Sequence, residues 1–199
     1  HYDRNKPIEN LKIGFFKEFF DGEGSHENDR RVLEDLKKMG LDLHPVNIKP
    51  SVDVNSILIM LFAEGASAFE DLTRLNLDDQ LVAQHRGAWP NLFRSARFIP
   101  AVEYLQASRF RSILIEEMHA LFQDYDVIIT PTFGGEQLQI TNLTGHPALC
   151  MPNGFSEKGS PTSITFLANL FDEEKLIMLG RAYQEATDWQ KNRPPFFDR

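Results

Sequence analysis

Five polar residues surround three short apolar runs in the C-terminal half of the sequence. They are Thr130, Thr132, Asn142, Thr144 and His146. Their hydroxyl, amide and imidazole groups can exchange hydrogen bonds with a small polar ligand, which makes them candidate substrate-side loop residues. Asn and Thr side chains also commonly satisfy the backbone of their own turn, and that structural role is an equally good interpretation of Asn142 and Thr144.

Four residues nearby carry groups that can act as nucleophile or base, namely Ser156, Lys158, Ser160 and Ser163. The surrounding Asn-Gly and Gly-Ser-Pro sequences are typical of turns, so we interpret these four as turn and strand residues. The single cysteine, Cys150, lies inside an apolar run and is expected to be a buried, unreactive thiol.

The remaining ionisable candidates have simpler structural interpretations. Glu64 is expected to be solvated or to cap a helix, and Arg94 and Arg97 to pair with the surplus acidic residues on one helical face. His119 has no His, Cys or carboxylate at a ligand-like spacing. The sequence therefore predicts no metal site and no cofactor.

The hydrophobic pattern predicts the elements that position these residues. Strands are expected at residues 11–16, 41–46, 126–130, 147–152 and 162–167, and helices at residues 26–39, 52–77, 99–125 and 172–186. The segment from Gly134-Gly135 to His146 is expected to be a loop, and Asn153-Gly154 a turn. The third helix should pack through Val102, Leu105, Ile113, Leu114, Met118, Leu121 and Phe122.

Alternating strands and helices predict an α/β fold with a mixed, largely parallel sheet of about five strands flanked by helices. A chain of 199 residues is compatible with a single domain. In such sheets ligands bind beyond the strand ends, where the five polar residues are expected to gather.

Several segments together resemble the C-terminal part of the amidase signature family. They are YDVIITPT, NLTGHPALCMPNGF and GSPTSITFLANLFDEEKLIMLGRAYQEAT, preceded in the same order by LKIGFFKEFF, EGASAFEDL and RFIPAVEYLQASRFR. The family consists of serine amidohydrolases and includes the A subunit of the Asp/Glu-tRNA amidotransferases. The likeness runs from about Leu11 to Pro195.

The resemblance implies a site that this chain does not contain. Family activity depends on a serine nucleophile, a second serine in a cis peptide and a lysine, and the serines lie in a Gly/Ser-rich N-terminal segment. No such segment occurs here. Residues 1–199 are therefore expected to be the C-terminal part of an amidase without its catalytic N-terminal half. The chain alone is expected to be inactive, whereas the parent protein would hydrolyse an amide or transfer its ammonia.

Composition limits the partners. The net charge of −8 argues against direct contact with nucleic acid, and no apolar run approaches the roughly 18 residues of a membrane span. We expect a cytoplasmic protein. Its partners would be a small amide substrate in the full-length enzyme and, on an exposed face, an N-terminal amidase half or a second copy. The alternative is a stand-alone, non-catalytic protein with an amidase-like fold that binds a ligand or partner.

Overall fold

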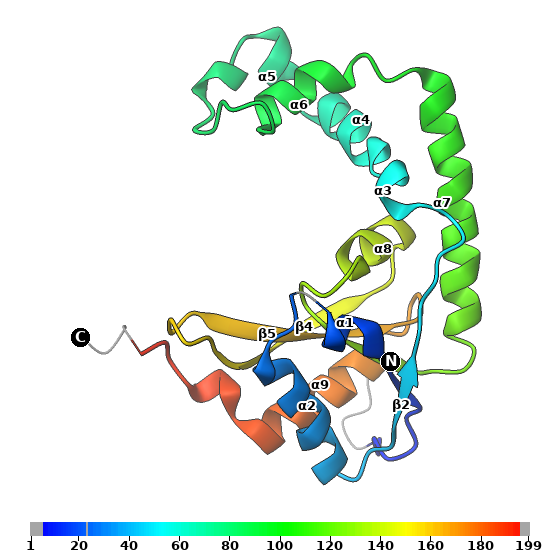
Figure 1. Ribbon diagram of the computed structural model, residues 1–199, viewed down its shortest axis with the longest axis vertical. Helices are drawn as coiled ribbons and strands as arrows, with labels where there is room; N and C mark the ends of the chain where they lie inside the picture. Colours follow the sequence, from blue (N-terminus) through cyan, green and yellow to red (C-terminus); the bar gives the residue numbers. More distant parts are fainter. Residues whose placement is uncertain (1–5, 23, 196–199) are drawn as a thin grey trace. The chain divides into compact units, whose positions relative to one another are not determined.

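The computed structural model describes residues 6–22 and 24–195. The chain divides into two compact units (Figure 1). Unit 1 consists of residues 1–49 and 116–199, and unit 2 consists of residues 50–115. The five candidate polar residues all belong to unit 1.

Unit 1 is built on a five-stranded sheet in the order β2-β1-β3-β5-β4. The strands are β1 (Ile13–Phe16), β2 (Leu43–Val46), β3 (Val127–Pro131), β4 (Ala148–Phe155) and β5 (Pro161–Ala168). β1 pairs in parallel with β2 and β3, whereas β5 pairs antiparallel with β3 and β4. The mixed α/β sheet is confirmed, with parallel and antiparallel pairings in equal number.

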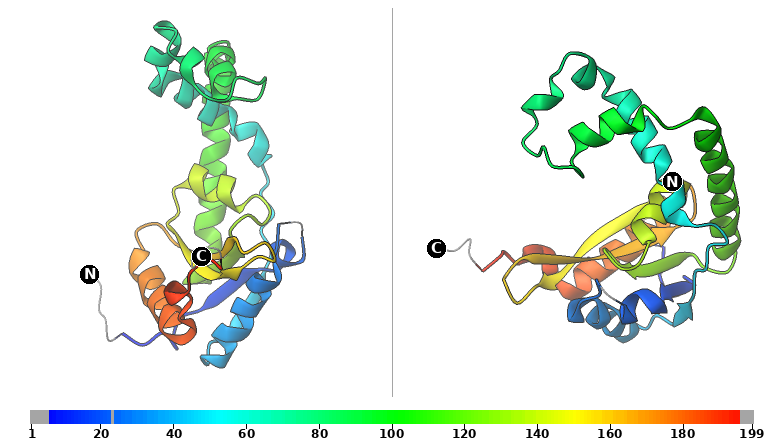
Figure 2. Two further views of the ribbon diagram at one scale, coloured as in Figure 1. Left: turned by 90° about the vertical axis from the view of Figure 1, so that its left-hand side faces the viewer. Right: turned by 45° about the horizontal axis from the view of Figure 1, so that its top comes forward.

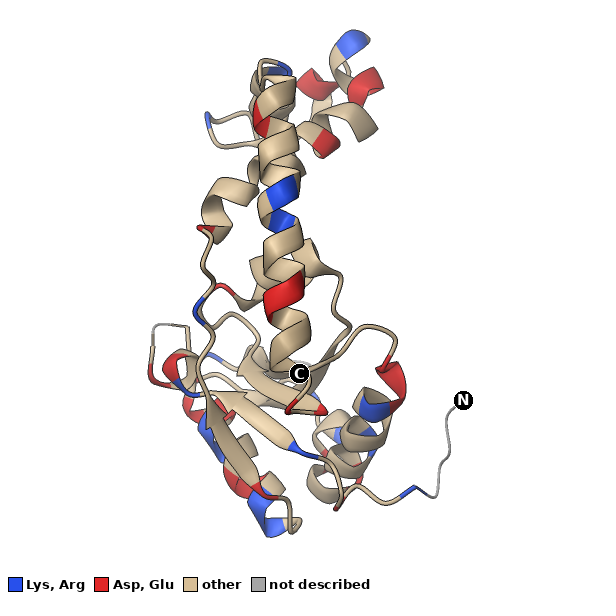
Figure 3. Cartoon of the chain, turned by 90° about the vertical axis from the view of Figure 1, so that its right-hand side faces the viewer, with Lys and Arg blue, Asp and Glu red and all other residues tan. Residues whose placement is uncertain are grey.

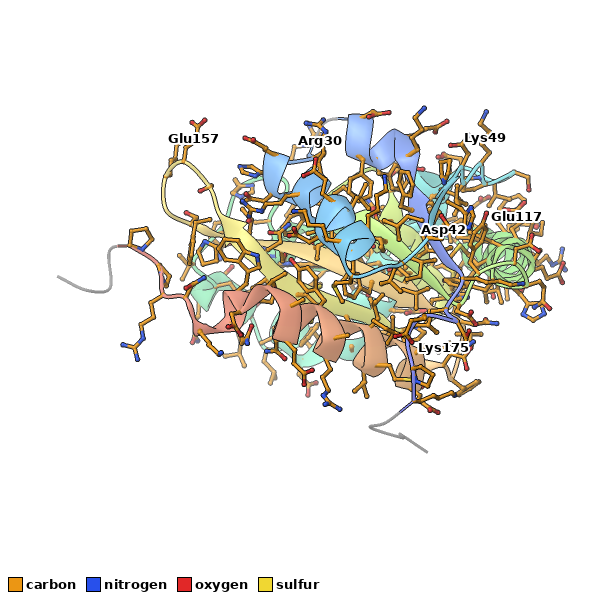
Figure 4. The ribbon with its side chains drawn as sticks, turned by 90° about the horizontal axis from the view of Figure 1, so that it is seen from below. Arg30, Asp42, Lys49, Glu117, Glu157 and Lys175 are labelled. Carbon is orange, nitrogen blue, oxygen red and sulfur yellow. The ribbon has the colours of Figure 1, made fainter. Side chains whose placement is uncertain are left out.

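Helical segments accompany this sheet in the described part of unit 1. They are α1 (Lys17–Asp21), α2 (Glu27–Lys38), α8 (Gln137–Thr144), α9 (Glu173–Thr187) and the 3₁₀ turn η2 (Trp189–Lys191). α2 and α9 cover one face of the sheet, and Figure 4 looks onto them. Their apolar sides meet the sheet in the main core, where Leu36, Phe166, Leu179 and Tyr183 are almost fully buried. α8 lies on the opposite face (Figure 1).

The segment before β4 was expected to be a loop and is instead the two-turn helix α8. Its Thr141 and Thr144 hydroxyls donate to the carbonyls of Gln137 and Ile140 within the same helix. These bonds satisfy the donor capacity of both buried hydroxyls within the helix. Gly145, with φ of 80°, ends it in the left-handed conformation that glycine adopts most easily.

The expected turn at Asn153-Gly154 is also wrong. Both residues lie inside β4, where the register shifts between Pro152 and Gly154. Such a bulge places an extra residue in one strand, and here it turns the Asn153 side chain toward α2. Asn-Gly is a common signal for both turns and bulges, because both use unusual backbone angles.

Unit 2 is helical. It contains α3 (Val54–Ile57), α4 (Ile59–Ala68), α5 (Glu70–Arg74), the 3₁₀ turn η1 (Asp78–Gln80) and α6 (Trp89–Ala96), as Figures 1 and 2 show. The single helix expected at residues 52–77 is therefore three short helices. The expected helix is interrupted at Leu58 and at Phe69. Phe69 has a φ of −108° and a ψ of 28°, which are not helical.

The long helix α7 (Ala101–Leu121) is confirmed and begins in unit 2 and ends in unit 1. Its expected apolar stripe is only partly correct. Leu114 and Met118 are buried, but Val102, Leu105 and Ile113 are exposed. Apolar residues therefore occur on opposite sides of this helix, and a linear pattern does not distinguish the packed side.

Charged candidates of unit 2 form structural pairs. Arg94 contacts Asp78 and Asp79 at 2.7 Å each, and Arg97 contacts Glu70 at 3.2 Å. Glu64 accepts a hydrogen bond from the Tyr104 hydroxyl at 2.8 Å. The expected pairing of both arginines is confirmed. Basic and acidic residues are similarly interspersed on α2 and α9 (Figure 3).

Candidate functional site: the hydroxyl-bearing face of the sheet

Strand register brings polar side chains together on one face of the sheet. Thr165 of β5 is the register partner of both Thr130 in β3 and Cys150 in β4. Directly paired residues point to the same face of a sheet, so these three side chains share a face. The adjacent row, Ile129, Phe166 and Leu149, points to the other face, where it joins the core beneath α2 and α9.

Four of these polar side chains form a continuous hydrogen-bonded group, which we call the hydroxyl cluster: Thr132, Ser163, Thr165 and Cys150. The Thr132 hydroxyl donates to the Ser163 carbonyl at 2.9 Å and accepts from the Ser163 hydroxyl at 3.0 Å. It also lies 2.9 Å from the Thr165 hydroxyl, which lies 3.4 Å from the Cys150 sulfur. The cluster thus joins the end of β3 to β5 and β4.

The order of these bonds determines which groups donate. A hydroxyl has one proton, and that of Thr132 goes to the Ser163 carbonyl, so Thr165 must donate to Thr132. The Thr165 oxygen is then free to accept the S–H of Cys150. In this arrangement Cys150 is a protonated donor, and the Ser163 hydroxyl donates to Thr132 and not to a base. Cys150 and Ser163 are the more accessible members of the cluster, which contains no activated nucleophile.

Cys150 differs from its expected environment, because its side chain is exposed. The prediction of a buried thiol failed because the apolar run that contains it is the edge strand β4. Alternate residues of an edge strand can face solvent even when the sequence is continuously apolar. The expectation that the thiol belongs to the packing and not to catalysis is still consistent with its bond to Thr165.

A second polar pair, Thr144 and His146, lies between α8 and β4. The Thr144 hydroxyl donates to the Ile140 carbonyl and must therefore accept from Nδ1 of His146, 2.8 Å away. The His146 ring stacks on Phe122 with centroids 5.1 Å apart, and the residue is only 5% exposed. Its Nε2 is consequently an unprotonated, buried acceptor with no hydrogen-bond partner among the described residues.

Burial is the main reason that the pKa of His146 is lowered to about 4, and the nearby His119 lowers it further. An unfolded histidine has a pKa near 6.5, so the unfolded chain binds a proton between these values and the folded chain does not. Stability is therefore highest above pH 6.5 and falls as the pH drops toward 4. Between pH 7 and pH 5 the expected loss from this residue is about 2 kcal/mol.

His146→Gln should remove this loss, because glutamine does not titrate but keeps an amide to donate to Thr144. The measurement is the free energy of urea unfolding at pH 7 and pH 5 for both proteins. His119→Gln, at an exposed position on α7, is the matched control and should keep most of the wild-type slope. An unchanged pH dependence in His146→Gln would show that the imidazole is not buried as described.

The other two candidates are placed differently. Thr130 is buried within β3, and its hydroxyl is 3.3 Å from the carbonyl of the following Pro131. Asn142 is exposed on α8 and donates to the Leu138 carbonyl at 2.7 Å. Among the five candidates, the structure therefore brings Thr144 and His146 together, joins Thr132 to the hydroxyl cluster, and leaves the Asn142 amide occupied by its own helix.

Gln137 belongs to this face of the sheet but was not expected there. Its side-chain amide donates to the Thr132 carbonyl at 2.5 Å, while its Oε1 is buried without a hydrogen-bond partner in the described part of the chain. This bond attaches the first turn of α8 to the end of β3. Nothing in the local sequence distinguishes Gln137 from the exposed polar residues around it, because its burial depends on α8 being a helix.

The neighbouring serines and lysine form a turn. The backbone N–H of Ser156 donates to the Ser160 carbonyl, and that of Ser160 donates to the Ser156 hydroxyl. Within residues 6–22 and 24–195, no group of three or more His, Cys, Asp or Glu side chains is placed to hold a metal ion. No helix in the same ranges is long and apolar enough to cross a membrane.

Curated proteins similar to this chain include subunits of tRNA-dependent amidotransferases. The A subunit of glutamyl-tRNA(Gln) amidotransferase from Cupriavidus necator is 27% identical, and the match covers 95% of this chain and 46% of that protein. The corresponding protein of Thermodesulfovibrio yellowstonii is 25% identical, with 95% and 48% covered. The chain thus spans about half the length of these curated relatives.

Solved structures show the same architecture. The native peptide amidase of Stenotrophomonas maltophilia superposes with a TM-score of 0.73 at 21% identity, covering 96% of this chain and 45% of that one. A bacterial aryl acylamidase of the amidase signature family superposes with a TM-score of 0.72 at 15% identity, and the match covers 92% of this chain and 45% of that one. The resemblance to the C-terminal part of amidase signature enzymes is confirmed. The Amidase family model matches residues 2–141, and the chain therefore belongs to the Amidase family.

Proposed function

We propose that this chain acts as the C-terminal portion of an amidase. It would supply sheet, core and substrate-side polar groups to a serine, cis-serine and lysine site carried by another segment. The whole protein would hydrolyse a carboxylic amide or transfer its ammonia to an acceptor. The observation that carries the proposal is the match of 95% of the chain to about half of a tRNA-dependent amidotransferase polypeptide.

The geometry of the sheet face supports a substrate-side role. The hydroxyl cluster places a thiol and hydroxyls on the adjacent strands β4 and β5 and at the end of β3, and the bond from Gln137 to the Thr132 carbonyl fixes α8 beside them. Thr130, Thr132, Asn142, Thr144 and His146 remain the proposed substrate-side residues. Of these, Thr132 is the one that belongs to the hydroxyl cluster, where its buried hydroxyl donates to the Ser163 carbonyl and accepts from the Ser163 and Thr165 hydroxyls.

The chain alone is expected to show no turnover of simple amides or of glutamine. The physical reason is that the Ser163 hydroxyl donates to Thr132, so within the described contacts it faces no base that could remove its proton. Ammonia release should equal that of a buffer blank, and a serine-reactive phosphonate should leave Ser156, Ser160 and Ser163 unlabelled.

The peptide amidase of Stenotrophomonas maltophilia is a suitable positive control for the assay. Turnover by this chain that disappears in Ser163→Ala would contradict the proposal directly. Saturable binding of an amide by the isolated chain, without turnover, would instead favour a stand-alone binding protein.

We also propose that the chain is cytoplasmic and that a protein partner covers part of its surface. The partner would be an N-terminal amidase half or a second copy. The two edge strands of the sheet are poor docking sites, because β2 contains Pro45 and β4 contains Pro152 beside its bulge. Prolines and bulges on edge strands prevent further strand pairing. The partner surface is therefore better sought outside the sheet.

A further inference from the structure

Exposed large apolar side chains are concentrated in unit 2. Among the described residues, eleven of them belong to this unit and four to unit 1, although unit 2 comprises only residues 50–115. Single exposed apolar residues are ordinary, but a concentration of them usually marks a surface that contacts another molecule.

Three aromatic rings of unit 2 form one stack, which we call the aromatic platform: Phe69, Phe93 and Trp89. The Phe93 ring stacks on both Phe69 and Trp89, with centroids 5.4 Å apart in each pair and interplanar angles of 29° and 30°. Phe93 is 5% exposed, whereas Phe69 and Trp89 are 54% and 48% exposed.

Close helix packing supports the platform from below. A side chain at Gly65 of α4 would meet the Phe93 and Trp89 rings at 3.6 and 3.8 Å, so the helix backbone lies directly behind them. The α4 backbone thus supports the Phe93 and Trp89 rings, and the Phe69 ring is supported by its stacking on Phe93. Rigid aromatic side chains lose little conformational entropy on binding and are the commonest energetic centres of protein interfaces.

Charge distribution favours unit 2 over unit 1 as the site of any self-association. Unit 2 has seven acidic and six basic residues, whereas the rest of the chain has 22 acidic and 15 basic residues. Two copies of unit 1 would repel each other, but two copies of unit 2 would not. Glu70, the acid next to Phe69, is already paired with Arg74 and Arg97, so little uncompensated charge would be buried beside the rings.

We propose that the aromatic platform of unit 2 is the contact through which two copies of this chain associate. A two-fold axis would bring the same half-exposed rings from each copy together, as in most homodimers. This inference rests on the proposal above that a protein partner covers part of the surface. Of the two partners named there, it selects a second copy of this chain, and it does not depend on catalysis.

Sedimentation velocity over a wide range of concentrations tests the proposal. The wild-type chain should shift from monomer to dimer, and Phe69→Ala should weaken the dissociation constant by at least tenfold. Phe98→Ala is the matched control, because Phe98 is a more exposed aromatic of the same unit outside the stack. It should leave the dissociation constant within about twofold of the wild type.

Two further measurements keep the result interpretable. Trp89→Tyr retains a ring and should restore association, even if Trp89→Ala unfolds unit 2. In a Trp189→Phe background, the fluorescence of Trp89 should shift to the blue as dimers form. A monomer at every concentration, or equal weakening in Phe69→Ala and Phe98→Ala, would overturn the inference.

The proposed amidase role is tested separately. If the chain stays monomeric but binds a co-expressed catalytic half of an amidase, the proposed self-association is wrong and the proposed function stands. If the chain dimerises but neither binds such a half nor shows amide-dependent behaviour, the dimer stands and the proposed function is wrong.

Discussion

Gly135→Ala is expected to lower the free energy of unfolding by roughly 4 kcal/mol, the largest effect of any substitution considered. Gly135 has a φ of 53°, a backbone conformation that costs about 1 to 2 kcal/mol for a residue with a Cβ. A Cβ at this position would also overlap the ring of Phe19. The ring cannot move freely, because it packs edge-on against Phe16 at 5.3 Å.

Gly40 provides a matched control for the backbone contribution. Its φ is 86°, but a Cβ there would have no neighbour within 4 Å among the residues that the structure describes. Gly40→Ala should therefore cost only about 1 kcal/mol, and the difference between the two variants measures the steric overlap. Urea unfolding followed by circular dichroism gives both values. Equal losses would mean that the loop before α8 does not pack on α1 as described.

The same substitution should affect the candidate site. Gly135 immediately precedes the first turn of α8, where Gln137 donates to the Thr132 carbonyl. Movement of the loop away from Phe19 would weaken that bond and displace α8 from the sheet. In a full-length relative with the corresponding glycine, we expect activity to fall together with stability.

The strands of the fold could be predicted from the sequence because their signals are local. Buried runs such as residues 127–130 are β-branched and bounded by proline, and α2 has acidic residues early, lysines late and Gly40 after its end. α8 could not be predicted in this way. Its buried side consists of Gln137, Thr141 and Thr144 as well as apolar residues, and such a composition is typical of a loop.

The candidate site could be predicted only as a set of residue types. The contact between Thr132 and Thr165 depends on the antiparallel register of β3 and β5, which are more than thirty residues apart in the chain. Register is determined by long-range packing and not by either strand alone. For the same reason, the sequence named His146 and Thr144 as separate candidates, but neither their pairing nor the burial of the imidazole against Phe122 could be predicted from it.

Asn153→Ala should have the second largest effect, a loss of about 3 kcal/mol at neutral pH. Asn153 is fully buried in the bulge of β4, and its amide donates to Oδ1 of Asp29 at 2.7 Å. The other Asp29 oxygen accepts from the backbone N–H of His26 and caps α2. Alanine would leave a buried carboxylate oxygen without a donor, which costs more than an ordinary hydrogen bond.

The bulge is held to α2 by two further residues. The Arg31 Nη2 donates to the Asn153 carbonyl at 2.6 Å, and the Asn28 amide donates to the Phe155 carbonyl at 3.0 Å. Gly154 between these carbonyls has a φ of 139°, and a Cβ there would meet both side chains at less than 3 Å. Loss of Asn153 should therefore loosen a connected network and not a single bond.

The pH dependence distinguishes this mechanism from simple loss of volume. Burial is the main cause that raises the pKa of Asp29. A raised carboxyl pKa means that the folded state favours the protonated form, so stability is retained at low pH and falls as the pH rises through the folded pKa. Without the Asn153 donor the pKa of Asp29 should rise further, and the destabilisation should be larger at pH 7 than at pH 4.5.

Asn142→Ala is the control, because Asn142 is exposed and bonds only to a carbonyl of its own helix among the contacts described. It should change the free energy of unfolding by less than about 0.5 kcal/mol at both pH values. Unfolding of the two variants in urea at pH 7 and pH 4.5 provides the comparison. If Asn153→Ala destabilises equally at both, the Asp29 carboxylate is not what the amide stabilises, and the link between α2 and the bulge depends on Arg31 and Asn28 instead.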